Sequence, residues 1–356
     1  MPEKQTLVLD RASIVTHFEM LGNLFGLQAQ KAPWPGFECG INQAEYEDIE
    51  ILIKEAHKLN GWFTDDQVRH AMQGWSRELT RGKLESWSER YTFAENSSKA
   101  VGLIMAGNIP MVGFHDLLAV LMSGHKVLLR PSSDDHVLIR MVVAILEKLD
   151  ENYSQRISWA EGKMRDFDAI IATGSNNTAR YFEYYFSKVP HIIRKNRNAI
   201  AILNGSENEE ELELLGQDIF QYFGLGCRNV SKIYVPADFD LDRFFKAVYK
   251  QHEIIQHNKY ANNYDYHKSI YLLNADNILE NGFMLLKETK DLASPVATVG
   301  YERYENEELL RKSLVQRSEE IQCIVSLKDV PFGQAQYPSL SDYADGVDTM
   351  SFLSGL

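Results

Sequence analysis

The sequence has few cysteines, and their spacing builds no site by itself. Its 356 residues include three, Cys39, Cys227 and Cys323, which are far apart and form no CxxC pair. An odd number of isolated cysteines excludes a disulfide framework and a cysteine-rich zinc site. It is typical of a reducing compartment. The sequence also contains no closely spaced pair of histidines with a carboxylate nearby, so we expect no metal site.

Positive charge and long apolar segments are also scarce. The chain holds 37 Lys and Arg against 50 Asp and Glu, a net charge of −13. The sequence therefore predicts no nucleic-acid partner, because phosphate contacts require clustered basic side chains. No apolar run approaches the ~18 residues of a membrane-spanning helix, and the first residues lack the order of a signal peptide. These absences favour a cytoplasmic protein.

The common nucleotide fingerprints are missing as well. The sequence contains neither GxGxxG nor GxxxxGKS, so it has neither the usual dinucleotide nor the nucleoside-triphosphate motif. What remains informative is the order of its predicted strands and helices. From residue 100 onward, short apolar runs alternate with helical patterns, which predicts βαβ units and a parallel sheet. The expected strands cover 100–107, 125–135 (which ends in a polar turn), 157–162, 166–175 and 199–203.

Three polar turns follow these predicted strands. They are Gly107-Asn108, Arg130–Ser133 and Thr173–Ser175. In parallel sheets ligands bind at the carboxyl ends of the strands, so these turns are candidate ligand contacts.

The rest of the chain is less regular. Residues 1–99 are expected to be largely helical, and the Asn204-Gly205 turn suggests a domain boundary near 204. Beyond it we expect helices at 206–223, 240–255 and 277–288, strands at 232–236, 296–301 and 321–327, a loop at 257–273 that feeds a strand, and an irregular tail at 328–356.

One stretch carries a lone cysteine behind two glycines. In YFGLGCRNVSKIYVP, residues 222–236, Cys227 follows Gly224 and Gly226 and precedes an apolar run that predicts a strand. Glycines let the backbone approach a substrate closely. The alternative is a small buried thiol at a helix-to-strand turn, because free cysteine packs as a small hydrophobe.

Taken together and in order, these turns resemble those of the aldehyde dehydrogenase superfamily. The closer resemblance is to its acyl-thioester reductase branch, which includes the fatty-acid reductase of bacterial bioluminescence. It covers roughly residues 100–300 and implies an aldehyde-dehydrogenase-like α/β fold. The implied domains are a Rossmann-type cofactor domain over 100–204 and an α/β catalytic domain over 205–327. A helical N-terminal region, 1–99, would pack on the cofactor domain, and a C-terminal tail would span 328–356.

The resemblance also implies roles for particular residues. Cys227 occupies the position of the nucleophile, and Asn108 that of the amide which, with the Cys227 backbone N–H, binds the oxyanion. The implied cofactor contacts come from the three turns and one carboxylate: Gly107; Arg130, Pro131, Ser132 and Ser133; Thr173, Gly174 and Ser175; and Asp291 in the segment Asp291–Val296.

Two departures from the family pattern refine the expectation. Ser133 replaces a ribose-binding glutamate and Arg130 replaces a lysine, which favours NADPH over NADH because an arginine fork binds phosphate. The alternative is that both are ordinary turn residues. The segment His191–Lys195 lacks the glutamate that activates water, so hydrolysis of an acyl-cysteine should be slow. His191 either donates a proton to the thiohemiacetal or caps a strand.

The predicted activity is NADPH-dependent reduction of a fatty acyl thioester, on CoA or a carrier protein, to the aldehyde. Aromatic residues that would line an acyl channel, or simply pack in the core, are Phe114, Tyr181, Tyr184, Tyr185, Phe220 and Tyr222. One alternative is an acyl-phosphate reductase, which predicts more basic residues near Cys227 than Arg228 and Lys232. Another is a non-catalytic nucleotide- or partner-binding protein. The oligomeric state stays open, with a homo-oligomer among the alternatives.

Overall fold

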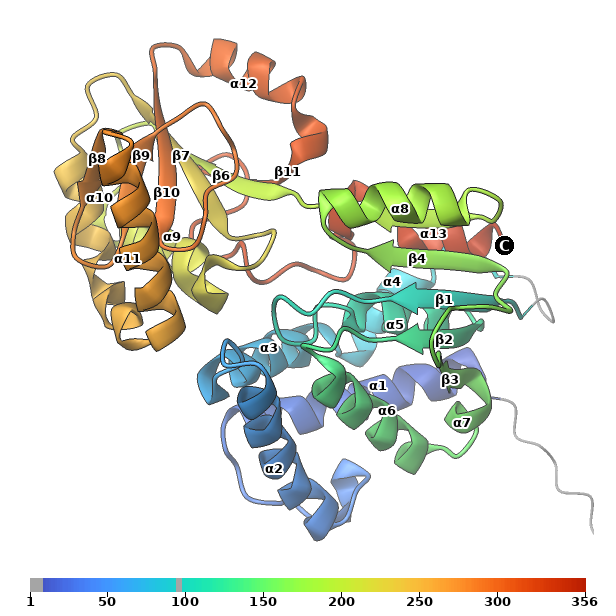
Figure 1. The fold of residues 1–356 in the computed structure, drawn as a ribbon. Helices are drawn as coiled ribbons and strands as arrows, with labels where there is room; N and C mark the ends of the chain where they lie inside the picture. Colours follow the sequence, from blue (N-terminus) through green and yellow to red (C-terminus); the bar gives the residue numbers. More distant parts are fainter. Residues whose placement is uncertain (1–8, 94–97) are drawn as a thin grey trace, which may run out of the picture. The chain divides into compact units, whose positions relative to one another are not determined.

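The computed structural model describes residues 9–93 and 98–356 and divides into two compact units, each built on a mainly parallel sheet (Figure 1). Unit 1 comprises residues 1–195 and 339–356, and unit 2 comprises residues 196–338. This confirms the α/β class. Residues 1–8, on which the signal-peptide prediction partly depends, lie outside the described residues.

The sheet of unit 1 has five parallel strands in the order β3-β2-β1-β4-β5. Their bounds are β1 Ala100–Ile104, β2 Lys126–Arg130, β3 Ile157–Trp159, β4 Ala169–Thr173 and β5 His191–Arg194. The chain moves outward from β1 in one direction and then, from β4, in the other. Such an order places a topological switch point between β1 and β4, where the carboxyl ends of the strands leave a crevice for a ligand.

Helices cover both faces of this sheet. Figure 1 shows α8 (Asn176–Phe186) on one face, and α5 (Phe114–Met122) and α6 (His136–Leu149) on the other. The N-terminal helix α1 (Arg11–Ala29) packs on α5 and α6 through apolar side chains such as the fully buried Phe18 and Leu21. The remaining helices of this region are α2 Gln43–Leu59, α3 Asp65–Glu78, α4 Arg81–Ser88 and α7 Tyr153–Arg156, with a 3-10 turn at Phe37–Cys39.

The C-terminal tail is more ordered than the sequence suggested. After residue 338 the chain returns to unit 1 and ends in α13 (Thr349–Ser354). The buried Arg194 guanidinium holds it there, because it donates to the Ala344 carbonyl at 2.6 Å and to Thr349 Oγ1 at 2.8 Å. The same guanidinium is paired with Asp116 at 2.6 Å.

Unit 2 contains a six-stranded sheet in the order β11-β6-β7-β10-β9-β8, parallel except for the β8–β9 hairpin. Its strands are β6 Asn198–Ile202, β7 Val230–Pro236, β8 Ile278–Glu280, β9 Leu285–Glu288, β10 Thr298–Tyr304 and β11 Ile321–Val325. Its helices are α9 Glu209–Phe220, α10 Leu241–Val248, α11 Asn258–Leu273 and α12 Glu307–Val315, with 3-10 turns at Gln221–Gly224, Tyr249–Gln256 and Ser318–Glu320. Because β6 pairs with β7 and β11, the units divide after residue 195 and not near 204.

Two expectations about unit 2 were wrong. The segment 257–273 is the helix α11, which begins where His257 Nδ1 accepts the Tyr260 N–H and buries Tyr260 and Tyr264 one turn apart. The segment 277–288 is the hairpin β8–β9, which turns at Gly282 with φ +91°. No helix in the described part of the chain is both long and apolar enough to cross a membrane.

Candidate active site

The sheet of unit 1 brings the three predicted cofactor turns to one edge. Gly107-Asn108 follows β1, Arg130–Ser133 ends β2, and Thr173–Ser175 ends β4, and all three strands are parallel neighbours. The first two turns are in direct contact, since a Cβ built on Gly107 would lie 2.7 Å from Ser132 Cβ and Oγ. Only glycine allows this approach of the two loops.

A buried carboxyl holds the loop that carries the half-buried Asn108. Asp135 is 2% exposed, and its Oδ2 accepts the Met111 N–H at 2.7 Å. Met111 adopts a left-handed conformation with φ +56°. Burial raises the pKa of Asp135 well above its usual range. Oδ1 of Asp135 is buried with no hydrogen-bond partner among the described residues. Nothing in the sequence indicated this contact beyond the position of Asp135, two residues after the Arg130–Ser133 turn.

The same edge of the sheet offers groups suited to phosphate. Ser175 is the N-cap of α8 and accepts the Thr178 N–H at 3.3 Å, so the first N–H groups of an 11-residue helix point from this end. Arg130 and Ser133 are exposed. Within residues 9–93 and 98–356, Arg130 forms no ion pair, which leaves its guanidinium available to an anion.

The structure places His191 at the opposite edge of the sheet. It is the first residue of β5 and is paired with Ile170, whereas Thr173 is paired with Arg194 at the other end of that strand. The ring is exposed, and its Nδ1 lies 2.8 Å from the Val189 carbonyl oxygen. His191 is therefore not brought together with the turns that follow β1, β2 and β4.

Cys227 lies in unit 2, half-buried in the turn between α9 and β7. After α9 the chain passes through three consecutive left-handed residues, Tyr222, Phe223 and Gly224, with φ of +52°, +57° and +77°. Such a run reverses the direction of the chain within a few residues. The cysteine is therefore at the helix-to-strand turn that the sequence predicted.

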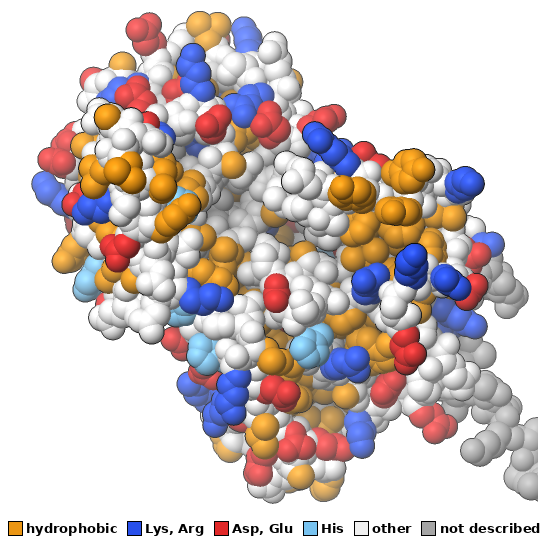
Figure 2. Space-filling model, viewed as in Figure 1, with side chains coloured by type: hydrophobic (Ala, Val, Ile, Leu, Met, Phe, Trp, Pro, Cys, Tyr) orange, Lys and Arg blue, Asp and Glu red, His pale blue; other side chains and the backbone are white. Residues whose placement is uncertain are grey.

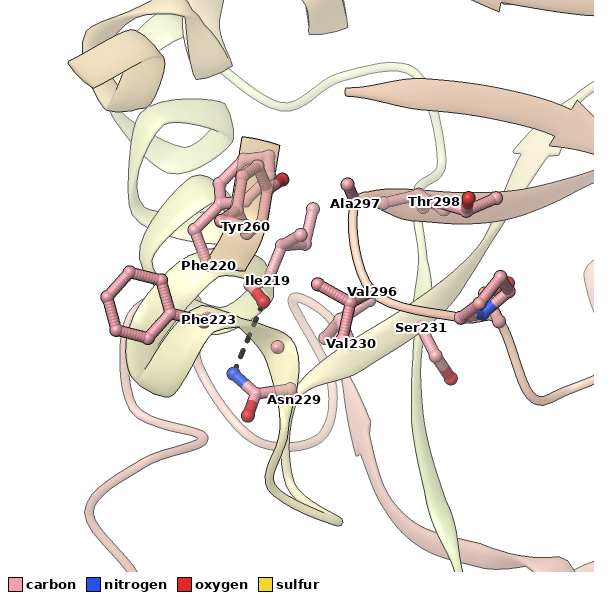
Figure 3. A pocket seen from close by; sticks show the side chains of 14 residues that line it. Ile219, Phe220, Phe223, Asn229, Val230, Ser231, Tyr260, Val296, Ala297 and Thr298 are labelled. Carbon is pink, nitrogen blue, oxygen red and sulfur yellow. Dashed lines mark hydrogen bonds between the residues drawn. The ribbon is translucent and has the colours of Figure 1, made fainter. Parts of the chain in front are cut away.

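The structure brings the Cys227 turn together with the segment that contains Asp291. Ser231 Oγ donates to the Leu292 carbonyl at 2.7 Å. Gly224 and Asn229 line a small cavity of about 20 Å³ together with residues 294–299 (Figure 3). That volume is room for about one water molecule. Asp291 itself is exposed. Cys227 and Asp291 belong to unit 2, and the other predicted site residues belong to unit 1.

The two basic residues that follow Cys227 have other partners. Arg228 Nε donates to the Ala335 carbonyl at 2.5 Å. Lys232 is fully buried, its Nζ lies 2.5 Å from Glu302 Oε2, and burial lowers its pKa. Among the described residues, no group of three His, Cys, Asp or Glu side chains is arranged to hold a metal ion.

The six candidate channel aromatics are in different environments. Phe114 is fully buried in the core of unit 1, whereas Tyr181, Tyr184 and Tyr185 are 66–78% exposed on α8. Hydrophobic side chains gather on the surface around α8 (Figure 2). Phe220 and Tyr222 are buried in unit 2, and only Phe220 of these two lines the cavity beside the Cys227 turn. The four residues of unit 1 thus form no common channel.

Comparisons with known proteins agree with this architecture. Among solved structures, an indole-3-acetaldehyde dehydrogenase of P. syringae, solved with NAD+, has a TM-score of 0.57 at 13% identity, covering 88% of this chain and 72% of that chain. An aldehyde dehydrogenase of Bacillus cereus has a TM-score of 0.59 at 13% identity, covering 88% and 71%. The aldehyde dehydrogenase KauB of Pseudomonas aeruginosa has a TM-score of 0.55 at 13% identity, covering 89% and 77%.

These likenesses establish the fold, and a sequence profile establishes the family. The search of the curated proteins found no match. The profile of the LuxC acyl-CoA reductases matches residues 65–250, which is more than half of the chain and includes the turns of unit 1 and Cys227. The chain belongs to the LuxC acyl-CoA reductase family and has the fold of the aldehyde dehydrogenase superfamily.

Proposed function

We propose that this oxidoreductase reduces a fatty acyl thioester, carried on CoA or a carrier protein, to the aldehyde with NADPH, through an acyl intermediate on Cys227. The observation that supports it most is the position of Cys227. It lies in a glycine-containing turn beside the Asp291–Val296 segment and within the residues that match the family.

The chemistry proposed for Cys227 begins with acyl transfer. The thiolate attacks the thioester carbonyl carbon, the bond from that carbon to the carrier sulfur breaks, and the carrier leaves as a thiol after taking up a proton. The Cys227 backbone N–H is proposed to donate to the developing oxyanion. Such donors are worth ~2.7–4 kcal/mol in other acyl-transfer sites. Asn108, in unit 1, is proposed as a second donor.

Reduction then releases the aldehyde. Bound NADPH supplies the hydride, two electrons, that reduces the acyl carbon. The oxygen takes a proton to give a thiohemiacetal on Cys227. Its C–S bond breaks, the hydroxyl proton passes to the sulfur, and the aldehyde leaves with Cys227 regenerated.

The residues of unit 1 fit a phosphorylated dinucleotide. Two of the turns flank the switch point between β1 and β4, and α8 directs its N-terminal N–H groups from the same edge. Arg130 brings an exposed guanidinium without a carboxylate partner among the described residues, and Ser133 brings no negative charge. We propose that Arg130 binds the 2′-phosphate, which favours NADPH over NADH.

The alternative of an acyl-phosphate substrate has less support. A phosphate leaving group would favour basic side chains directed at the cysteine. Arg228 is engaged by the Ala335 carbonyl and Lys232 by Glu302, so neither is a ready phosphate ligand.

The test is mass spectrometry of the intact protein after incubation with a panel of acyl-CoAs in the absence of cofactor. We expect a mass increase of one acyl group that is lost in Cys227→Ala, together with loss of acyl-CoA-dependent NADPH oxidation. Turnover that survives Cys227→Ala would overturn the covalent mechanism. Loss of turnover in Cys227→Ala combined with unchanged turnover in Asn108→Ala would remove Asn108 from the oxyanion site.

A further inference from the structure

One buried amide links the end of α9 to the residue before Cys227. Asn229 is 3% exposed and lies two residues after the cysteine. Its Nδ2 lies 3.1 Å, 3.2 Å and 2.7 Å from the carbonyl oxygens of Asp218, Ile219 and Gln221. Its Oδ1 accepts the Gly226 N–H at 2.8 Å. In Figure 3 the side chain points toward the end of α9.

The three carbonyls are ones that the geometry of a helix end leaves in need of donors. α9 ends at Phe220, and the last carbonyls of a helix have no intrahelical partner. An amide has two N–H groups and an acceptor oxygen, so Asn229 can donate to these carbonyls while it accepts from the residue before the cysteine. Aspartate would accept but not donate, and alanine would do neither.

The turn between these contacts is strained. A left-handed conformation is unfavourable for a residue other than glycine, and the turn contains two such residues, Tyr222 and Phe223. The Phe223 ring packs 4.3 Å from the His257 ring, which fixes one side of the turn. A strained turn persists only where its surroundings hold it, and Asn229 supplies the contacts on the side of the cysteine.

We propose that Asn229 is a positioning residue for Cys227. Its amide fixes the turn so that the thiol and the Cys227 backbone N–H keep the orientation that acyl transfer requires. The proposal rests on the proposed function for its effect on turnover. Its effect on the reactivity of the thiol is independent of that function.

The experiment compares Asn229→Ala and Asn229→Asp with the wild type and with Asn208→Ala. Asn208 caps the other end of α9, where its Oδ1 accepts the Glu211 N–H at 2.9 Å. Removing such a cap destabilises a helix, so this variant reproduces a general loss of stability without touching the turn. Two quantities are measured: the rate of Cys227 alkylation by iodoacetamide over a pH series, read by peptide mass spectrometry, and kcat and KM for NADPH oxidation with acyl-CoA.

We expect both Asn229 variants to change the Cys227 alkylation rate about tenfold and to shift its pH midpoint. We expect kcat to fall about 100-fold, because small misplacements of a reacting group have effects of that order, while KM for NADPH stays unchanged. Asn208→Ala should leave the alkylation profile and kcat within about twofold of wild type, because its capping contact lies at the start of α9, away from the turn.

Folded Asn229 variants whose Cys227 reacts and turns over like that of Asn208→Ala would overturn the proposal. If Asn229→Ala does not fold, the proposal is tested with Asn229→Ser and Asn229→Asp. An unchanged Cys227 alkylation profile in both of these variants would overturn it. An altered profile in a protein whose wild type reduces no acyl-CoA would contradict the proposed function and leave the positioning role standing.

Discussion

The loop that carries Asn108 and the turn that carries Cys227 are held in a similar way, by hydrogen bonds between one buried side chain and the backbone. The first side chain accepts from an N–H group, whereas the second both donates to carbonyls and accepts from an N–H group. Each contains left-handed residues other than glycine, Met111 in the first and Tyr222 and Phe223 in the second. Each is held by one buried polar side chain close in sequence to a predicted site residue. In unit 1 that side chain is the carboxyl of Asp135, and in unit 2 it is the amide of Asn229.

The difference follows from which backbone groups each segment leaves without partners. The loop after β1 leaves the Met111 N–H, which needs an acceptor, and a carboxyl supplies one. The turn after α9 leaves helix carbonyls, which need donors, and an amide supplies them. One consequence is that the Asn108 loop depends on a titratable group, whereas the Asn229 contacts carry no charge.

The largest effect on stability should come from deleting the carboxyl group of Asp135. Asp135→Ala leaves the buried Met111 N–H without an acceptor and should lower the free energy of unfolding by about 1–3 kcal/mol. Asp135→Asn keeps an acceptor oxygen in the same place and should be the milder variant. Urea denaturation of both variants checks this. Equal losses in the two would show that the Met111 contact is not what Asp135 contributes.

The pH dependence should separate the two segments. The pKa of Asp135 is raised in the folded protein, chiefly by burial and to a lesser extent by the neighbouring Asp134. Its contribution is therefore fully present below the unfolded pKa of about 3.9 and is lost as the pH rises through the raised folded value. The stability of Asp135→Asn relative to wild type should accordingly increase from acidic toward neutral pH.

The control for this titration is Ser231→Ala, which removes an uncharged hydrogen bond to the Leu292 carbonyl. Its stability relative to wild type should not change with pH. A flat profile for Asp135→Asn as well would mean that Asp135 keeps the same protonation state in the folded and unfolded chains.

Gly224, in the Cys227 turn, should contribute less to stability than Asp135. Gly224 has φ +77°, and a Cβ there would meet only the Ile219 carbonyl oxygen at 3.4 Å. The cost of Gly224→Ala is then mainly that of the left-handed backbone, about 1–2 kcal/mol. Gly224→Asn should cost less, because asparagine tolerates this conformation. Thermal unfolding of the two variants checks the order, and a smaller loss for alanine would contradict it.

The sequence predicted what local patterns determine. The alternation of apolar runs and helices located β1, β2, β4 and the turns at their carboxyl ends, and the resemblance pointed to Cys227. The prediction from sequence failed where tertiary contacts determine the structure. The 257–273 segment looked like a loop because tyrosine and asparagine obscured the buried pair Tyr260 and Tyr264. β6 belongs to unit 2 only because its partners are β7 and β11.

The supporting residues were missed for a related reason. Asp135 and Asn229 act on backbone groups, and a sequence does not show which backbone groups lack partners. Asp218 is a further example. Its buried carboxyl accepts the N–H groups of Gly333 and Ala335 at 2.7 Å and 2.9 Å, more than 100 residues away, and burial raises its pKa to about 6. These contacts tie the 331–338 segment to the helix that leads to Cys227.

The smallest effect is expected at His191, which belongs to neither segment. Its exposed ring lies at the amino edge of the unit 1 sheet and contacts the Val189 carbonyl. His191→Ala should change the free energy of unfolding by less than about 0.5 kcal/mol and kcat by less than about twofold, as surface substitutions generally do. Steady-state kinetics of His191→Ala, measured together with those of Asn108→Ala, check this. A loss in His191→Ala as large as that in Asn108→Ala would instead require this edge of the sheet to reach the reacting groups, and would favour the proton-donor role that the resemblance allowed.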